Sequence, residues 1–256
     1  MNRPNIPLKL SDRYSDDENI GRLKTIIRRI VSKANDEQSL IVEIASTIGA
    51  EILYGLREQG SELNSVDVSR QLGASRTPVR VALQILEQEG LVELPPRRRP
   101  RVAVLSIEGV KELYSVRASI AAIVATEAAL KATDAELDQL TQFVSEIENA
   151  TATNDNEAYF WINMRFHERL SEMAHNATLA RILDTLVLRS LLLKRMALSY
   201  PGRTARSARD HIAIIEALKD RDQNLAGALA KSNVLGAYGA LEIQLSGATR
   251  STIVCQ

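Results

Sequence analysis

The last 150 or so residues constrain the fold most, because they follow a single periodicity. From Ser106 onward, apolar side chains recur at the spacing of an α-helix, as at Ile182, Leu186 and Leu193, and no segment shows the alternation of a strand. This half of the chain is therefore expected to form an all-helical antiparallel bundle of about six to seven helices. The candidate helices cover about 106–132, 135–150, 154–174, 177–199, 204–220 and 223–246, with Asp134, Asn176 and Asp222 at N-cap positions.

The first 105 residues follow a different plan, with three short helices and a hairpin. Helices are expected over Glu37–Arg57, ended by Gly60, over 64–72, and over 75–89, with Ser75 as N-cap and Gly90 as the stop. Two alternating runs, 91–94 and 101–105, flank a proline-rich basic tip and predict a β-hairpin. This order predicts a winged helix-turn-helix. A polar arm with a basic amphipathic helix, Ile20–Lys33, precedes it and is expected to pack on the next domain. The expected regions are thus 1–36, 37–105 and 106–256.

Overall composition excludes several classes of protein. The 32 Lys and Arg residues balance 32 Asp and Glu residues, so no net charge attracts the whole chain to nucleic acid or to acidic lipid. The single cysteine, Cys255, rules out an internal disulfide framework and a multi-thiolate zinc site. We find no apolar run of the roughly 18–20 residues that span a bilayer, and no secretory signal. We therefore expect a cytoplasmic protein with no membrane partner.

Basic charge is concentrated in one short stretch. Between residues 69 and 105 the chain has seven arginines and three glutamates. Arg76, Thr77 and Arg80 stand at the expected start of the second helix of the helix-turn-helix, and Arg97, Arg98, Arg99 and Arg101 stand on the hairpin. Arginine binds phosphates and pairs with guanine in the major groove, and a helix N-terminus favours phosphate. These arginines at a helix start and a hairpin tip predict binding to double-stranded DNA rather than a merely solvated surface.

These residues also carry a family resemblance. The segment Ala74–Arg80, with Ala82-Leu83 and Leu86–Val92, resembles the DNA-binding domain of GntR-type transcription regulators. The helical half is similar to the FCD ligand-sensing domain of the FadR-like branch, through Leu113–Arg117, Phe166-His167 and His211. The resemblance implies an effector-responsive homodimer, usually a repressor, which binds a pseudo-palindromic operator. It adds Ser75 and Ser65 as DNA contacts. At the wing tip, Arg99 stands where the family usually has glycine.

The same resemblance implies a metal or effector site in the helical half. Many relatives hold a divalent ion such as Zn²⁺ with an aspartate, a histidine four residues later and two further histidines. Here those positions are Asn163, His167, His211 and Asn233. Two imidazoles remain, and two ligands have become amides, whose oxygens are neutral, weaker donors. Two alternatives stay open: a weak ion site completed by an effector carboxylate, or a metal-free pocket in which these side chains bind the effector directly.

An arginine is the expected anchor for an acidic effector. Arg117 occupies the family's arginine position on the first helix of this half, and a buried guanidinium needs an anionic partner. The other interpretation is an interhelical ion pair with Glu127 or Glu168. Arg189 and Arg165 are further candidates for the effector, whereas His175 is interpreted as a cap or surface residue.

Two other classes of function compete with a small-molecule-controlled regulator. A metal-dependent helical-bundle enzyme would use His167 and His211 to activate water, but it lacks three firm ligands and a positioned general base. Glu168 follows His167 directly, and neighbouring helix positions point about 100° apart. An architectural DNA-binding protein would have no effector pocket. We therefore expect a regulator and not an enzyme.

Overall fold

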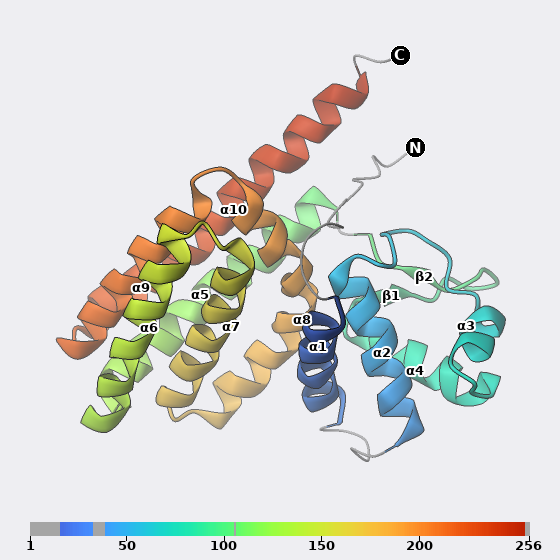
Figure 1. Cartoon of the computed structure of the whole chain (residues 1–256), viewed down its shortest axis with the longest axis horizontal. Helices are drawn as coiled ribbons and strands as arrows, with labels where there is room; N and C mark the ends of the chain where they lie inside the picture. The colour runs from blue at the N-terminus through green and yellow to red at the C-terminus, as the bar shows by residue number, and fades with distance from the viewer. Residues whose placement is uncertain (1–15, 33–38, 105, 254–256) are drawn as a thin grey trace. The chain divides into compact units, whose positions relative to one another are not determined.

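The computed structural model describes residues 16–32, 39–104 and 106–253, which form ten helices and a two-stranded sheet in two compact units (Figure 1). The first unit ends at Leu105 and includes Val187–Leu192 of a long helix; the second unit contains the rest of the helical half. The predicted division between residues 36 and 37 and the lone Cys255 lie outside the described residues.

The first unit is a small helical domain with a hairpin. Its helices share a core that includes Ile48, Leu83 and Leu86, and Gly49 of the second helix lies so close to Ile27 and Leu86 that an added Cβ would be 3.1–3.2 Å from their methyl carbons. The elements are α1 (Asp16–Val31), α2 (Leu40–Tyr54), α3 (Ser65–Gln71), α4 (Arg76–Gln88), β1 (Val92–Glu93) and β2 (Arg101–Val102).

The basic helix α1 packs against α2. Its apolar side chains, among them Leu23 and Ile27, are buried. On its polar side, Lys24 donates to Glu43 at 2.9 Å, and Arg28 pairs with the same carboxylate. The cations of this helix are therefore partly neutralised by α2.

Helix α2 is shorter than the sequence pattern predicted. Its predicted start at Glu37 lies outside the described residues, and Ser39 is its N-cap, accepting from the Val42 N–H at 3.2 Å. It ends at Tyr54 because Gly55 adopts φ 90°, the left-handed conformation that closes helices. The predicted end at Arg57 and Gly60 was therefore wrong, because two glycines were available and the first one is the cap.

A short segment before α3 pairs with the outer edge of the hairpin, alongside β2. Val92 pairs with Val102, and Glu93 pairs with Arg101, in an antiparallel register. On the other side of β2, the Leu63 N–H donates to the Pro100 carbonyl at 2.7 Å, and the Val102 N–H donates to the Ser61 carbonyl at 2.9 Å. The segment before α3 therefore supports the hairpin as a wing.

The second unit is a helical bundle, as its periodicity predicted. Figure 1 shows α5 and α10 running beside each other, and these two helices make the most extensive contact in the unit. Its core includes Ala125, Phe166, Ile214 and Leu218. The helices are α5 (Ile107–Lys131), α6 (Asp134–Ala152), α7 (Asn156–Met173), α8 (Ala177–Ser199), α9 (Arg203–Lys219) and α10 (Gln223–Ile253).

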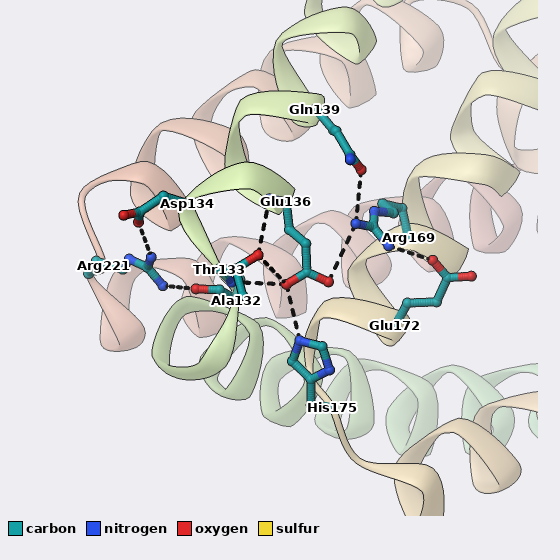
Figure 2. A network of polar contacts seen from close by, with 9 residues as sticks. All are labelled: Ala132, Thr133, Asp134, Glu136, Gln139, Arg169, Glu172, His175 and Arg221. Atoms are coloured by element: carbon teal, nitrogen blue, oxygen red, sulfur yellow. Dashed lines mark hydrogen bonds and ion pairs between the residues drawn. The ribbon is translucent and has the colours of Figure 1, made fainter.

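A polar network joins three turns of this bundle (Figure 2). Thr133, not the predicted Asp134, is the N-cap of α6, and it forms a reciprocal capping box with Glu136. The Glu136 carboxylate also meets His175 Nε2 at 3.1 Å and Arg169 at 3.4 Å. Arg221, in the turn between α9 and α10, donates to Asp134 at 2.6 Å and also to the Ala132 carbonyl.

Helix α5 is the one described helix long and apolar enough to span a bilayer by length and composition alone. Core helices of soluble proteins pass the same test. Here Val124, Ala125, Ala128 and Ala129 of α5 belong to the core of the bundle.

Candidate nucleic-acid interface and ligand cavity

The N-terminus of α4 is an exposed, cationic surface. Ser75, Arg76, Thr77 and Arg80 are all exposed. Ser75 occupies the N-cap position, as predicted, but its side chain makes no capping hydrogen bond. The first-turn N–H groups, which have no partners within a helix, are therefore not satisfied by that side chain and favour an anion such as phosphate.

Burial of the opposite face fixes the orientation of α4. Val79, Ala82, Leu83 and Leu86 are buried, whereas Arg76, Thr77 and Arg80 are exposed on the other side of the helix. Pro78 lies in the first turn, where its missing N–H costs no hydrogen bond. Ser65, the first residue of α3, is partly buried, and its carbonyl accepts from the Ser69 hydroxyl at 2.6 Å.

The wing exposes three arginines, and two of its four arginines form ion pairs. Arg97, Arg98 and Arg99 are exposed, and Arg99 also pairs with Glu62 at 2.8 Å, whereas Arg101 is partly buried and pairs with Glu93. The Arg98 N–H closes a turn on the Pro95 carbonyl at 3.2 Å. Arg97, the third residue of that turn, has φ 57°. The position that favours glycine is therefore Arg97, and not Arg99.

A small cavity of about 30 Å³ lies inside the second unit, between α5, α7, α8, α9 and α10. Because one buried water needs roughly 10–15 Å³ of such space, the cavity has room for about two or three waters. Of the residues predicted from the sequence, four line it: Arg117, Asn163, His167 and Asn233. The other lining residues are Tyr114, Lys194, Ala197, Leu198, Arg203, Ser207, Val234 and Ala237.

His211 lies directly behind this lining and is fully buried. Its Nε2 atom is 3.3 Å from Nε2 of His167 and 3.4 Å from the side-chain amide nitrogen of Asn163. The i, i+4 pair shares one face of α7 and meets His211 of α9. When both rings are neutral, one Nε2 carries the proton of the bond between them and the other accepts it.

Burial keeps both imidazoles neutral. Desolvation is the main cause that lowers the pKa of His211 to about 3, with Lys194 as a further cause. Desolvation and Lys194 also hold the pKa of His167 well below its ordinary value. The Tyr159 hydroxyl lies 2.9 Å from His211 Nδ1, and burial raises the pKa of that hydroxyl to about 12. The cluster thus adds no charge to the cavity at neutral pH.

Asn233 lies on the same cavity but turns its amide away from the histidines. Its Nδ2 donates to Asp210 at 3.0 Å and to the Ser207 hydroxyl at 3.3 Å. Its backbone carbonyl accepts from Arg203 at 2.8 Å. Asn233 therefore positions polar groups of α9 instead of completing a set with His167 and His211.

Three cations from three different helices line the cavity. Arg117 of α5 lies over the Tyr114 ring, 4.9 Å from its centroid, and forms no ion pair with any described carboxylate. Lys194 of α8 donates to the Met164 sulfur at 3.4 Å. Desolvation, assisted by Arg117, holds the pKa of that amine well below its ordinary value. Arg203 of α9 is 4% exposed.

Several buried polar atoms at the cavity lack hydrogen-bond partners among the described residues. They are the hydroxyl of Tyr114 and the Nε and Nη1 atoms of Arg203. The nearest carboxylate to Arg203 is Asp210, whose Oδ2 atom is 3.8 Å from Nη1, beyond hydrogen-bond distance. Burial raises the pKa of Tyr114, so its hydroxyl remains a donor. Unsatisfied buried donors are costly, and they point to an acceptor that completes the site.

Three other residues named from the sequence lie elsewhere. Arg189 belongs to the stretch of α8 grouped with the first unit, where it donates to the Gln88 and Glu89 carbonyls at 3.2 and 3.3 Å. Arg165 is exposed and pairs with Glu146. His175 is a surface residue on Glu136 (Figure 2).

Arg203 also lines a second, larger hollow. This open groove of about 880 Å³ runs between α9 and α10 and includes Arg206, Arg209, Lys231 and Leu235. Arg203 is thus a lining residue of the inner cavity and of the outer groove.

The donor set does not fit a divalent metal ion. The Nε2–Nε2 distance of 3.3 Å is close to the ~3.4 Å between two nitrogen ligands of a tetrahedral zinc. However, no carboxylate or thiolate lines the cavity, and the described residues contain no group of three His, Cys, Asp or Glu side chains that could hold a metal ion. Arg117, Lys194 and Arg203 line the same space, and their positive charge opposes a cation.

Sequence reasoning missed Tyr114, Lys194 and Arg203. Lys194 interrupts a strongly apolar stretch, Leu191–Leu198, and that interruption was the available signal. Arg203 follows a glycine at a helix start, a position typical of exposed residues. Its 4% exposure depends on packing between α9 and α10, which the pattern alone does not contain.

Comparison with known proteins agrees with this division into two units. Residues 40–102 match the description "Bacterial regulatory proteins, gntR family", and residues 112–234 match the FCD domain. The HTH-type regulator YdhC of Bacillus subtilis is 28% identical, over 68% of this chain and 79% of its own. The HTH-type transcriptional repressor RspR of Escherichia coli is 25% identical, over 75% and 85% respectively.

Solved structures show the same fold. A putative GntR regulator from Rhodococcus sp. RHA1 superposes with a TM-score of 0.63 at 21% identity, over 81% of this chain and 98% of its own. Both matched regions and both relatives are those of transcriptional regulators, not of enzymes. The chain therefore belongs to the gntR family of bacterial regulatory proteins, with an FCD domain in its helical half, and is a transcriptional regulator of that type.

Proposed function

We propose that this regulator is a homodimeric repressor that binds a pseudo-palindromic operator and is controlled by a small organic acid in the cavity of its second unit. The observation that carries the proposal is the cavity itself, in which cations and unpartnered donors gather in a unit separate from the DNA-reading helix. Binding of the acid would alter the spacing of the two recognition helices in the dimer, and symmetric half-sites require a fixed spacing.

Repression and a cytoplasmic location are inferred from the relatives. RspR is named as a repressor, and it matches most of this chain. Bacterial DNA is cytoplasmic, so a protein that reads an operator acts there.

A stripe of exposed apolar side chains supports the homodimer. Val116, Ile123 and Leu130 are 50%, 47% and 59% exposed and are spaced seven residues apart on α5. A seven-residue repeat lies along one face of a helix and is typical of a surface that packs on another helix. Leu235 and Ile243 of the neighbouring α10 are also exposed. We infer that this stripe meets the same stripe of a second copy, as expected for a two-fold axis.

We propose that the acid is bound directly, without a metal ion. The charge of the cavity supports this alternative over the zinc site that the family resemblance allowed, with His167, His211 and Asn163 as polar neighbours of the ligand. Loss of acid binding on treatment with a chelator, with recovery on addition of Zn²⁺, would favour the metal instead.

The test of DNA reading begins with selection of duplexes from a random-sequence pool by the purified wild-type protein. Arg76→Ala is then expected to lower affinity for the selected duplex at least about 10-fold, because the variant loses an arginine contact at the helix N-terminus. Arg181→Ala is the matched control, since Arg181 is an exposed arginine of α8 in the second unit. Fluorescence anisotropy measures affinity, and sedimentation measures the oligomeric state.

Three results would contradict the proposal in distinguishable ways. If the pool yields no enriched sequence, the protein is not an operator-binding regulator. If Arg76→Ala binds like the control, the recognition helix is wrongly assigned. If DNA affinity is unchanged by every organic acid that binds, the protein is an architectural DNA-binding protein and not a ligand-controlled one.

A further inference from the structure

We propose that the cavity selects a small anion with two negative charges, a short dicarboxylate, which Arg117, Lys194 and Arg203 bind together with the Tyr114 hydroxyl. This inference rests on the proposed function and specifies the chemical class of its ligand. The residues come from α5, α8 and α9 and line one small cavity.

The charges of the side chains around the cavity indicate how many negative charges the ligand carries. Three cationic side chains line the cavity, and no carboxylate does. One carboxylate lies close behind, Asp210 at 3.8 Å from Arg203 Nη1, and it offsets one cation. Arg117 remains without an ionic partner among the described carboxylates, and an anion beside the Lys194 amine favours the protonated form of that amine, so a bound ligand meets two cations that Asp210 does not offset. A ligand with two carboxylates neutralises both.

The hydrogen-bonding groups agree with that count. The Nε and Nη1 atoms of Arg203 and the Tyr114 hydroxyl are all donors without partners among the described residues. Among the described residues, the Lys194 amine donates only to the thioether sulfur of Met164, at 3.4 Å, and this sulfur is a weak acceptor. Carboxylate oxygens accept from all of these groups, and guanidinium binds a carboxylate through two parallel bonds.

The volume of the cavity limits the size of the ligand. Room for about two or three waters excludes large sugar or fatty acids in this conformation. A three- or four-carbon diacid needs a modest outward shift of the lining. Arg203 contacts the Asn233 carbonyl of α10, so a shift that engages Arg203 is transmitted to the helix that runs along α5.

The test compares acids of equal length on the purified full-length protein by isothermal titration calorimetry. Malonate is compared with propionate, and succinate with butyrate; oxalate, glutarate, adipate and inorganic phosphate complete the panel. We expect at least one diacid to bind about 10- to 100-fold more tightly than its matched monoacid, because the second carboxylate gains a charge-assisted contact. EDTA is expected to leave the affinity unchanged. If no diacid binds more tightly than its monoacid, or if EDTA abolishes binding, the proposal is wrong.

Lys194→Met separates a binding role from a structural one. The substitution replaces a partly buried cation by an apolar side chain of similar length, so the ligand-free melting temperature is expected to stay the same or rise. Diacid affinity is expected to fall about 10-fold or more, to that of the monoacid, whereas monoacid affinity changes little. Lys231→Met, at an exposed position of α10, is the control and keeps full diacid preference.

A second variant covers the case in which Lys194→Met does not fold. Arg117→Met also removes an unpaired cation and is expected to abolish the preference for two carboxylates. Wild-type preference in whichever variant folds would overturn the proposal. Failure of the proposed function looks different: a diacid would bind with the expected selectivity but would leave DNA affinity unchanged.

Discussion

Glu136 shows how one carboxylate can hold several turns in place. It accepts from the Thr133 backbone N–H at 2.9 Å and lies beside His175 and Arg169, which belong to α7 and the turn after it (Figure 2). The Thr133 backbone hydrogen bond is the main cause that lowers the pKa of Glu136 from 4.5 to about 2, with His175 assisting. Folding therefore favours the charged form of this side chain.

That pKa predicts a pH-dependent contribution to stability. A carboxyl group with a lowered pKa in the folded protein stabilises it above its unfolded pKa of about 4.5, and this contribution is lost as the pH falls from there toward about 2. Glu136→Gln is expected to lower the free energy of unfolding by about 1 kcal/mol at pH 7. The difference from wild type should shrink between pH 5 and pH 3.

Urea unfolding at pH 7, 5, 4 and 3 measures this difference. Glu148→Gln, at an exposed position of the same helix, is the control and should match wild type throughout. A deficit in Glu136→Gln that stays constant down to pH 3 would show that the charge of Glu136 does not contribute.

Residue types and spacing on one helix predicted part of the cavity. Asn163 and His167 lie four apart on α7, and that spacing alone places them on one face. Arg117 lines the same space, as the family position implied. Lys194 and Arg203 were missed because their burial depends on which face of α8 and α9 meets neighbouring helices. Arg189 was misplaced for the same reason.

At the scale of elements, the approach of α10 to α5 depends on one glycine. A Cβ at Gly227 would lie 2.5 Å from the Thr126 hydroxyl oxygen and 3.2 Å from the Ala122 carbonyl oxygen. The Thr126 hydroxyl donates to the Gln223 carbonyl at 3.2 Å, so it cannot rotate away without loss. Gly239, twelve residues later on α10, has open space at the same position.

Two alanine substitutions on α10 should therefore change the free energy of unfolding in opposite directions. Gly239→Ala is expected to raise the free energy of unfolding by up to about 1 kcal/mol, since alanine favours a helix. Gly227→Ala gains the same propensity but overlaps with α5, and a net loss of about 1–2 kcal/mol is expected. Urea unfolding compares the two, and equal stability of both variants would contradict the close approach.

Helix positions were predictable because apolar periodicity is a local property, but helix ends were not. Gly55 and Gly60 both have positive φ and both suit a C-terminal cap, and α2 ends at Gly55, the first of them. At α6, both Asp134 and Thr133 suit an N-cap, and the capping box between Thr133 and Glu136 makes Thr133 the cap. At the wing tip, the residue with positive φ is Arg97, whereas the family resemblance has glycine at the position of Arg99.

At the scale of the whole molecule, the proposed dimer determines how DNA affinity depends on salt. If each subunit neutralises about four phosphates, the logarithm of affinity should fall with the logarithm of salt with a slope of about −7 for a dimer. A slope near −2 would contradict this docking on DNA.

Ile123→Glu tests the dimer and the slope together. A charge in the middle of the α5 stripe is expected to shift the protein to monomers in sedimentation and to reduce the slope to about −4, since one subunit contacts half as many phosphates. Leu56→Glu, at an exposed apolar position of the first unit, should remain dimeric. A dimer that persists in Ile123→Glu would place the interface elsewhere.

The guanidinium of Arg203 lines both the inner cavity of the second unit and the open groove between α9 and α10. A ligand that neutralises this guanidinium from the cavity also changes the charge that the groove presents to any molecule bound there. Any substitution of Arg203 therefore alters the electrostatics of both sites at once.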